Sequence, residues 1–340
     1  MCEGVAAGTA ATTDAGMLET KILSPRQRIR GVLAPGVTPF KADLSPDSER
    51  FIAHCRWLLS QNCGLAPFGT TSEANSMSAK ERMTLLDALA KAGIDPLRMM
   101  PGTGCCSITE TVELTRHAVN HGCAGVLMLP PFYYKNVSEE GLYRYFSEVV
   151  QRVCDARLRI YLYHIPPVAI VGITPNLVER LLTAYPNAIA GMKDSSGDWN
   201  NTKSFLRAFA RDGFDVFVGS ESFLLANIRN GGAGTISATA NVNAAAIYQL
   251  YARWNTTDDP DYSDRQQSKL NPLRDVFART SWPSMIAALK QAIAIYRNEP
   301  EWTRVRPPLV ELTIEQAKLL AEELTAIGFA LPTIGISDSV

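Results

Sequence analysis

The strongest constraint on the fold is a regular alternation of short apolar segments with longer amphipathic segments, from about Arg30 to Trp254. Short aliphatic runs bounded by Gly, Pro or Ser indicate buried strands, whereas apolar residues spaced three or four apart indicate helices. A helix follows each predicted strand, which favours a closed (β/α)8 TIM barrel. The eight strands are predicted at 31–39 (with the exit loop), 64–68, 99–102, 125–129, 159–163, 188–193, 215–218 and 234–237.

Capping residues support the predicted helices. Ser78–Glu81, Ser107–Glu110 and Thr313–Gln316 have the Ser/Thr-x-x-Glu/Gln pattern of a capping box. Ser45-Pro46 is expected to open the first helix, with serine as the cap and proline in the first turn. A doubly wound open sheet is the alternative, but no Gly-x-Gly-x-x-Gly sequence opens any strand-to-helix turn.

The alternation predicts a catalytic barrel over residues 28–255. Three further helical segments within 256–331 are too few to form an independent core, so we expect a C-terminal helical appendage packed on the barrel. Residues 1–27 are rich in Ala, Gly and Thr and lack the pattern of a secretory signal, which indicates a flexible leader. Residues 332–340 are expected to form a loose tail.

Composition excludes several classes of function. The 340 residues are 46% hydrophobic and 20% charged with a net charge of -1, so no basic surface for nucleic acid is expected. No apolar run approaches the roughly 20 residues that a membrane span needs. The seven cysteines are scattered without a Cys-x-x-Cys pair, which favours reduced thiols and a cytoplasmic location.

The histidines offer no evident metal motif. His117 and His121 stand four apart on a predicted helix, but the glutamate of the zinc-protease pattern is missing beside them. We therefore favour a solvated or partly buried pair and predict no metal. A metal-dependent aldolase would need several ligands at the carboxyl ends of the strands, where His164 is the one evident candidate.

A lysine ends the sixth predicted strand. Lys193 follows a buried apolar run and precedes a turn-forming Asp-Ser-Ser-Gly sequence, so it is expected where the strand leaves the core. Active sites of barrels lie at the carboxyl ends of strands. Other polar or glycine-bearing segments share that end: Thr38-Pro39, Gly69–Glu73, Pro130–Tyr134, Tyr163–Pro166, Gly219–Glu221 and Ser237–Asn241.

These residues suit carbonyl chemistry through an imine. A lysine amine attacks a ketone only when unprotonated, and partial burial of an amine lowers its pKa. A phenol such as Tyr163 moves protons without adding a fixed charge, and Thr70-Thr71 offers hydroxyls and N–H groups for a carboxylate. Taken alone, each of these features has an ordinary structural explanation: Lys193 as a surface lysine, Tyr163 as a core tyrosine and Gly69–Thr71 as a turn. Their position together at one end of the barrel favours an active site.

The chain resembles the class I, pyruvate-dependent aldolases and lyases around dihydrodipicolinate synthase and N-acetylneuraminate lyase. Gly69-Thr-Thr-Ser-Glu73 is similar to the Gly-Thr/Ser-Thr-Gly-Glu sequence of that family, with serine at the fourth position. Tyr163-His-Ile-Pro166 resembles its Tyr-Asn-Val/Ile-Pro segment, and Gly191-Met-Lys-Asp194 resembles the segment with the Schiff-base lysine. The resemblance extends over about Arg30 to Leu331.

The resemblance implies roles for these residues. Lys193 would form the imine with a 2-oxo acid, Tyr163 would be the acid/base phenol and Thr70 its proton-relay partner. Tyr134 matches a tyrosine lent across a tight dimer interface, so a homotetramer built as a dimer of dimers is implied. No metal or organic cofactor is implied. The residues expected to bind substrate are Gly69, Thr71, Gly219 and Ile236.

One departure from the family bears on the substrate. Dihydrodipicolinate synthases usually carry an arginine soon after the Tyr-Asn-Val-Pro segment, which holds the carboxylate of the aldehyde, but 166–172 contains none. His164 also replaces the usual asparagine. We therefore favour a lyase or dehydratase acting on a sugar acid or another 2-oxo acid. The alternatives are a true 4-hydroxy-tetrahydrodipicolinate synthase, which condenses pyruvate with aspartate semialdehyde, and a non-catalytic relative that binds a 2-oxo acid.

Overall fold

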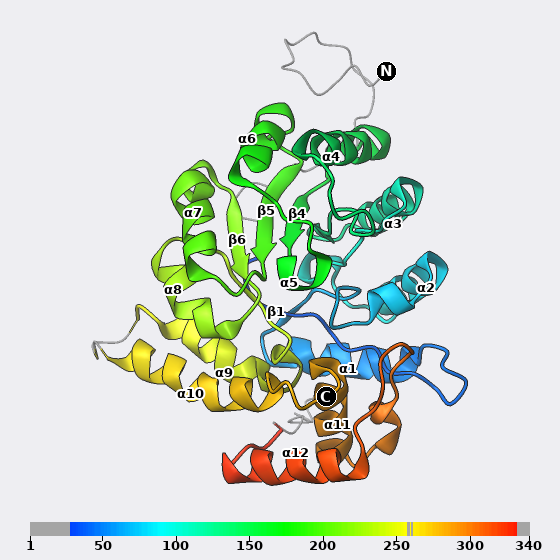
Figure 1. Ribbon diagram of the computed structural model, residues 1–340, viewed down its shortest axis with the longest axis vertical. Coiled ribbons are helices and arrows are strands. Elements are labelled where there is room, and N and C mark those ends of the chain that lie inside the picture. Colours follow the sequence, from blue (N-terminus) through cyan, green and yellow to red (C-terminus); the bar gives the residue numbers. More distant parts are fainter. Residues whose placement is uncertain (1–27, 257–258, 260, 332–340) are drawn as a thin grey trace.

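The computed structural model describes residues 28–256, 259 and 261–331; the predicted leader 1–27 and tail 332–340 lie outside the described residues. Helices surround a curled sheet of parallel strands (Figure 1). The strand order is β2-β1-β7-β6-β5-β4-β3. The strands are β1 (Gly31–Ala34), β2 (Gly64–Leu65), β3 (Val126–Met128), β4 (Ile160–His164), β5 (Ile189–Asp194), β6 (Asp215–Val218) and β7 (Gly234–Ile236).

The segment 99–102 closes this sheet into a barrel. Met99 forms a parallel bridge with Leu65 of β2, and Gly102 forms one with Leu127 of β3. A Cβ on Gly102 would lie 2.1 Å from the carbonyl oxygen of Phe68, so only glycine allows the backbones to approach this closely. The third predicted strand, at 99–102, therefore exists as isolated bridges, and the predicted (β/α)8 barrel is confirmed.

Eight helices with the predicted order follow the strands in the described part of the chain. Ser78 forms a complete capping box with Glu81, whereas Ser107 accepts from the backbone N–H of Glu110 without a reciprocal bond. These helices are α1 (Ser48–Ser60), α2 (Ala79–Lys91), α3 (Ile108–Asn120), α4 (Glu139–Val153), α6 (Pro175–Ala184), α7 (Trp199–Phe209), α8 (Leu224–Arg229) and α9 (Ala240–Arg253).

Two local predictions need correction. Helix α1 is capped by Asp47, whose carboxylate accepts from Arg50 N, because Ser45 instead bonds to Asp43 in the preceding turn. Helix α5 (Pro166–Ala169), where two prolines start a single helical turn, was not predicted. Short 3₁₀ helices, none of them predicted, occur at Ala74–Ser76, Pro96–Arg98, Ala210–Asp212, Glu221–Phe223 and Pro300–Thr303.

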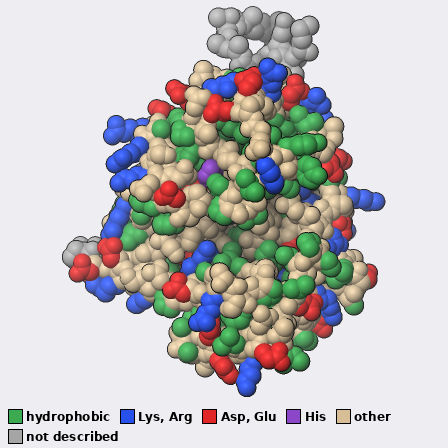
Figure 2. Space-filling view, viewed as in Figure 1, with side chains coloured by type: hydrophobic (Ala, Val, Ile, Leu, Met, Phe, Trp, Pro, Cys, Tyr) green, Lys and Arg blue, Asp and Glu red, His purple; other side chains and the backbone are tan. Residues whose placement is uncertain are grey.

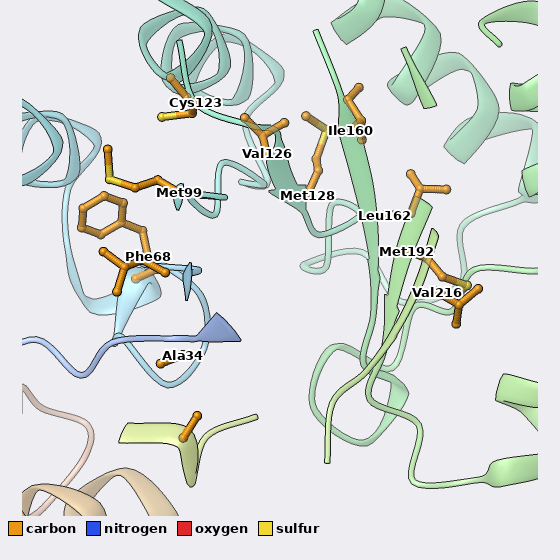
Figure 3. Close-up of a cluster of buried hydrophobic side chains, with 14 of the residues drawn as sticks. Ala34, Phe68, Met99, Cys123, Val126, Met128, Ile160, Leu162, Met192 and Val216 are labelled. Carbon is orange, nitrogen blue, oxygen red and sulfur yellow. The ribbon is translucent and has the colours of Figure 1, made fainter. Parts of the chain in front are cut away.

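The strands separate two apolar layers. Successive side chains of a strand point to opposite faces, so Leu162 and Met192 pack outward against the helices, beside Met128 of β3 (Figure 3). Tyr161 and Tyr163 of β4 point inward and join the cluster that fills the barrel. This alternation decides which residues of each strand can reach the site.

The C-terminal helices form a third cluster, which packs on the barrel. Helices α10 (Tyr262–Phe277), α11 (Met285–Arg297) and α12 (Ile314–Ala326) lie beside α9 and α1 (Figure 1). Their core includes the fully buried Val37 and Val242 from the barrel. The predicted division into residues 28–255 and 256–331 remains a prediction.

The helices and the surface bear on the predictions made from composition. None of the described helices is long and apolar enough to cross a membrane. Charged side chains of both signs surround the face in Figure 2, whose hollowed centre is mainly uncharged.

The prediction of reduced thiols is wrong at Cys154, which is disulfide-bonded. The free cysteines in the described residues are Cys55, Cys63, Cys105, Cys106 and Cys123.

A buried histidine joins the barrel to the appendage. His54 of α1 is fully buried; its Nε2 lies 3.0 Å from Asn241 Oδ1, and Arg297 of α11 lies 3.1 Å from its Nδ1. Because Arg297 donates to Nδ1, the proton of the neutral ring sits on Nε2. Burial, reinforced by the charge of Arg297, lowers the pKa of His54 from 6.5 to about 3.

This shift predicts acid sensitivity at the junction. Between pH 3 and 6.5 the unfolded chain binds a proton that the folded chain does not, so stability falls as pH falls below 6.5. By about pH 4 the free energy of unfolding of the wild type should have fallen by about 3 kcal/mol because of His54. The His54→Gln variant, which keeps one donor and one acceptor but does not titrate, should not show this fall. Urea unfolding of both proteins at pH 7 and at the acid end tests the difference; equal pH slopes would refute it.

Candidate active site

Tyr163 and Lys193 face each other inside the barrel. They are direct partners in the β4–β5 register, and the Lys193 Nζ lies 3.3 Å from the Tyr163 hydroxyl and 4.4 Å from the centre of its ring. Both are buried, with 3% of Tyr163 and 5% of Lys193 exposed. No carboxylate of the described residues forms an ion pair with Lys193, so its amine nitrogen faces a phenol rather than an acid.

A register irregularity places Lys193 on the inner face. Ile160 pairs with Ile189, but the next residue, Tyr161, pairs with Gly191, so Ala190 is an extra residue in β5. An extra residue reverses the side-chain alternation of the strand beyond it. Lys193 thereby follows the inward direction of Tyr163.

Thr70 extends this pair into a chain of three polar groups. Its Oγ1 lies 3.4 Å from the hydroxyl of Tyr163. The loop turns tightly, because Ala74 N donates to Gly69 O and Glu73 has a positive φ of 57°. In the described residues, the backbone N–H groups of Thr70 and Thr71 donate to no protein acceptor, so they are available to an anion. A small cavity of about 10 Å³ separates Gly69 from Tyr163.

Buried polar contacts hold the loop that carries Thr70 in place. The hydroxyl of Thr38 donates to Ser72 O at 2.7 Å, so the loop after β1 holds the loop after β2. The carboxylate of Glu73 forms a 2.6 Å ion pair with Lys290 of α11 and also accepts from Arg306 N. Both charged side chains are fully buried. The appendage therefore supports the loop of Thr70.

Two other predicted residues lie at the adjacent strand ends. Gly219 N donates to Asp194 O at 2.7 Å, and a Cβ on Gly219 would lie 2.0 Å from Ser195 Oγ. The side chain of Ile236 is fully buried in the barrel interior with Tyr163. Gly219 therefore lets the β5 and β6 loops approach, and Ile236 packs below the site; substrate contact by either stays a prediction.

Tyr134 and His164 do not join this chain of groups within one subunit. Tyr134 is 74% exposed and contacts Tyr133 edge to face. His164 points outward, because it follows the inward Tyr163, and its Nδ1 accepts from Ile173 N at 2.8 Å. Burial lowers the pKa of His164. The expectation that His164 stands at the carboxyl-end opening as a metal-ligand candidate is wrong.

A buried carboxylate that was not predicted, Glu221, follows β6 at the carboxyl ends of the strands. Glu221 is 2% exposed and accepts hydrogen bonds from the hydroxyls of Ser237 and Thr239. The signal was present, since an acid after one strand and two hydroxyls after the next share one end of a barrel. Among the described residues, the one group of three side chains placed to hold a metal ion lies elsewhere, on α2 and α3.

The fold and this constellation define a (β/α)8 barrel with an amine, a phenol and a hydroxyl in contact at the carboxyl ends of its strands. Comparison with protein families matches residues 28–327 to the dihydrodipicolinate synthetase family. The chain belongs to this family, and it is an enzyme of the class I pyruvate-dependent lyases and aldolases. The resemblance seen in the sequence is thus confirmed.

Individual relatives agree with this assignment. A DapA-like lyase of uncharacterised function from Chloroflexus aurantiacus is 32% identical over 296 residues, which cover 86% of this chain and 94% of the relative. The crystal structure of dihydrodipicolinate synthase from Agrobacterium tumefaciens has a TM-score of 0.76 at 32% identity, covering 88% of this chain and 99% of that one. A prophage protein of the same family from E. coli K12, in complex with pyruvate, has a TM-score of 0.80 at 27% identity, covering 88% and 98%.

The Glu73–Lys290 pair yields a stability prediction. Lys290→Met leaves the Glu73 carboxylate buried without its partner, which should cost about 3–5 kcal/mol. Adding Glu73→Gln removes the unpaired charge, so the double variant should recover much of that loss. Urea unfolding of the wild type, both single variants and the double variant measures the coupling; additive losses would contradict it.

Proposed function

We propose that Lys193 forms an imine with the ketone of pyruvate or another 2-oxo acid, and that the enzyme cleaves, joins or dehydrates a sugar acid such as a 2-keto-3-deoxy acid. The observation that supports this most is the contact between the Lys193 amine and the Tyr163 hydroxyl inside the barrel. A buried amine beside a proton-transferring phenol is the arrangement that imine chemistry requires. No metal or organic cofactor is part of this mechanism.

The proposed reaction begins at the Lys193 nitrogen. The amine adds to the ketone carbon, the ketone oxygen takes up protons and leaves as water, and a protonated imine remains. This cation accepts the electron pair when a C–H or C–C bond at the neighbouring carbon breaks, which gives an enamine. The Tyr163 hydroxyl carries protons to and from the reacting oxygen, and Thr70 Oγ1 passes them onward.

The loop after β2 would hold the carboxylate of the 2-oxo acid. The N–H groups of Thr70 and Thr71 have no protein acceptor, and the Thr70 hydroxyl lies beside Tyr163. Backbone N–H groups in a tight turn bind small anions without bringing a positive charge into the site. The loop after β2 would therefore bind the 2-oxo acid, and the other loops would determine which second substrate is accepted.

The loop after β4 favours a sugar-acid substrate over aspartate semialdehyde. It contains α5, and Val168 and Ile170 expose 61% and 63% of their surfaces where an arginine would be needed for a second carboxylate. A true 4-hydroxy-tetrahydrodipicolinate synthase is the alternative, since a relative of that name from Thermus thermophilus is 38% identical over 213 residues.

We also propose that the enzyme is cytoplasmic and a homotetramer, built as a dimer of dimers. The loops after β3 and β4 carry four apolar or aromatic side chains that are each more than 60% exposed: Tyr133, Tyr134, Val168 and Ile170. Lys135 Nζ donates to Phe132 O and Ala169 O, which ties the two loops that carry them. Exposed apolar side chains on two loops that are tied together favour a partner subunit, and Tyr134 would reach its neighbour's site there.

Covalent trapping tests the imine. Incubation with pyruvate followed by borohydride should attach the reduced three-carbon acid to a single peptide, the one that contains Lys193. Lys193→Arg should abolish the adduct, whereas Lys203→Arg on α7 should keep it. Tyr163→Phe should form it at least about tenfold more slowly, because general acid–base catalysis contributes about 10²–10⁴-fold. Lack of an adduct with pyruvate and with a panel of 2-oxo acids would refute the mechanism.

A substrate comparison tests the finer assignment. With pyruvate as donor, kcat/KM should be higher for sugar-derived aldehydes than for aspartate semialdehyde. Val168→Arg should raise the value for aspartate semialdehyde about tenfold, the gain expected for one charge-assisted hydrogen bond. Val310→Arg, at a residue 60% exposed elsewhere, is the matched control and should change neither value. A wild-type preference for aspartate semialdehyde would instead establish the synthase alternative.

A further inference from the structure

A cluster of metal-binding side chains lies on the outside of the barrel, between neighbouring helices. Asp87 comes from α2, and His117 and His121 come from α3, where they stand four residues apart on one face. These helices lie side by side in the outer layer (Figure 1). His117 is in the last turn of α3 and His121 is its C-cap, so the cluster lies toward the amino ends of the strands, opposite Lys193.

Three ligand atoms converge there. The Nε2 of His117 lies 2.8 Å from Asp87 Oδ1, and the Nε2 of His121 lies 2.7 Å from the same oxygen. The two rings meet nearly at right angles, with their centres 4.8 Å apart. All three ligand atoms lie within 4.8 Å of one another. Each ring thus turns its Nε2, rather than a carbon edge, toward one point.

Hydrogen bonding accounts for only part of this arrangement. His121 is hydrogen-bonded to Asp87 Oδ1, but the buried Nε2 of His117 has no hydrogen-bond partner despite the short distance. A buried nitrogen that faces a carboxylate oxygen without a correctly directed proton is unfavourable. A cation bound by all three atoms would give His117 Nε2 a partner and would replace the hydrogen bond of His121 with a metal–ligand bond.

We propose that Asp87, His117 and His121 bind a Zn²⁺ ion, which cross-links α2 to α3. Two imidazoles and a carboxylate form a ligand set that suits zinc, with water at the remaining position. Ligands of tetrahedral zinc lie about 3.3 Å apart, so Asp87 must retreat by about 0.5 Å. It can do so because 56% of its side chain is exposed. The C-terminal end of α3 also favours a positive charge.

The ion would be structural and independent of the imine site. It binds the folded helices and not the unfolded chain, so it should stabilise the protein by mass action. Removing zinc with a chelator should lower Tm while leaving the borohydride-trapped adduct on Lys193 unchanged.

Titration of the untagged, metal-free chain with Zn²⁺ at pH 7.5 tests the site. We expect one ion per chain by calorimetry and a rise in Tm of a few degrees. His117→Ala and Asp87→Asn should each lose binding at concentrations that saturate the wild type. Cys105→Ser/Cys106→Ser, which removes two thiols that precede the amino end of α3, opposite the end with His117 and His121, should bind as the wild type does.

Co²⁺ supplies a second readout that does not depend on stability. The bound ion should show the visible absorption of a four- or five-coordinate site without a thiolate charge-transfer band, and His121→Ala should remove it. Far-UV circular dichroism in chelator shows whether the variants are folded. Absence of stoichiometric binding to the wild type, or unchanged binding after the histidine substitutions, would overturn the proposal.

Discussion

The direction of side chains along β4 and β5 is the constraint on which the site depends. Parallel pairing sets Tyr163 opposite Lys193, and the extra residue Ala190 turns the lysine inward with the tyrosine. The same alternation sends His164 and Asp194 outward, where His164 accepts from Ile173 N and Asp194 accepts from Thr202. A slip of one residue would bury two polar groups in the helix layer and leave the barrel without an amine.

A second constraint joins the appendage to the site. Glu73 in the loop of Thr70 reaches Lys290 of α11 across 217 positions of sequence, and both side chains are fully buried. Burial lowers the pKa of Lys290 to about 8, which shows how strongly the ammonium depends on its partner. The helices after the barrel are therefore part of what holds the site loop in place, rather than a separate addition.

The fold could be predicted from the sequence more completely than the candidate site. Strand-to-helix alternation predicted the barrel, and the position of Lys193 at a strand end pointed to the candidate site, because both depend on local patterns. The inward direction of Lys193 could not be predicted, since it depends on a register irregularity that only the pairing of β4 with β5 reveals. The outward direction of His164 follows from regular alternation after the inward Tyr163. The sequence likewise presented His117 and His121 as an ordinary helical pair, because Asp87 comes from another helix.

The two ends of the barrel differ in how tightly their side chains are packed, and this explains where substrate specificity can change. Toward the amino ends, Arg30 and Tyr161 contact the buried Asp215, and such interlocked charges tolerate little substitution. At the carboxyl ends, the amine and phenol sit on rigid strands, whereas Val168 and Ile170 sit on an exposed loop. Under the proposed mechanism, imine chemistry therefore depends on the strands, whereas the choice of substrate depends on the loop after β4, which has apolar residues in place of an arginine.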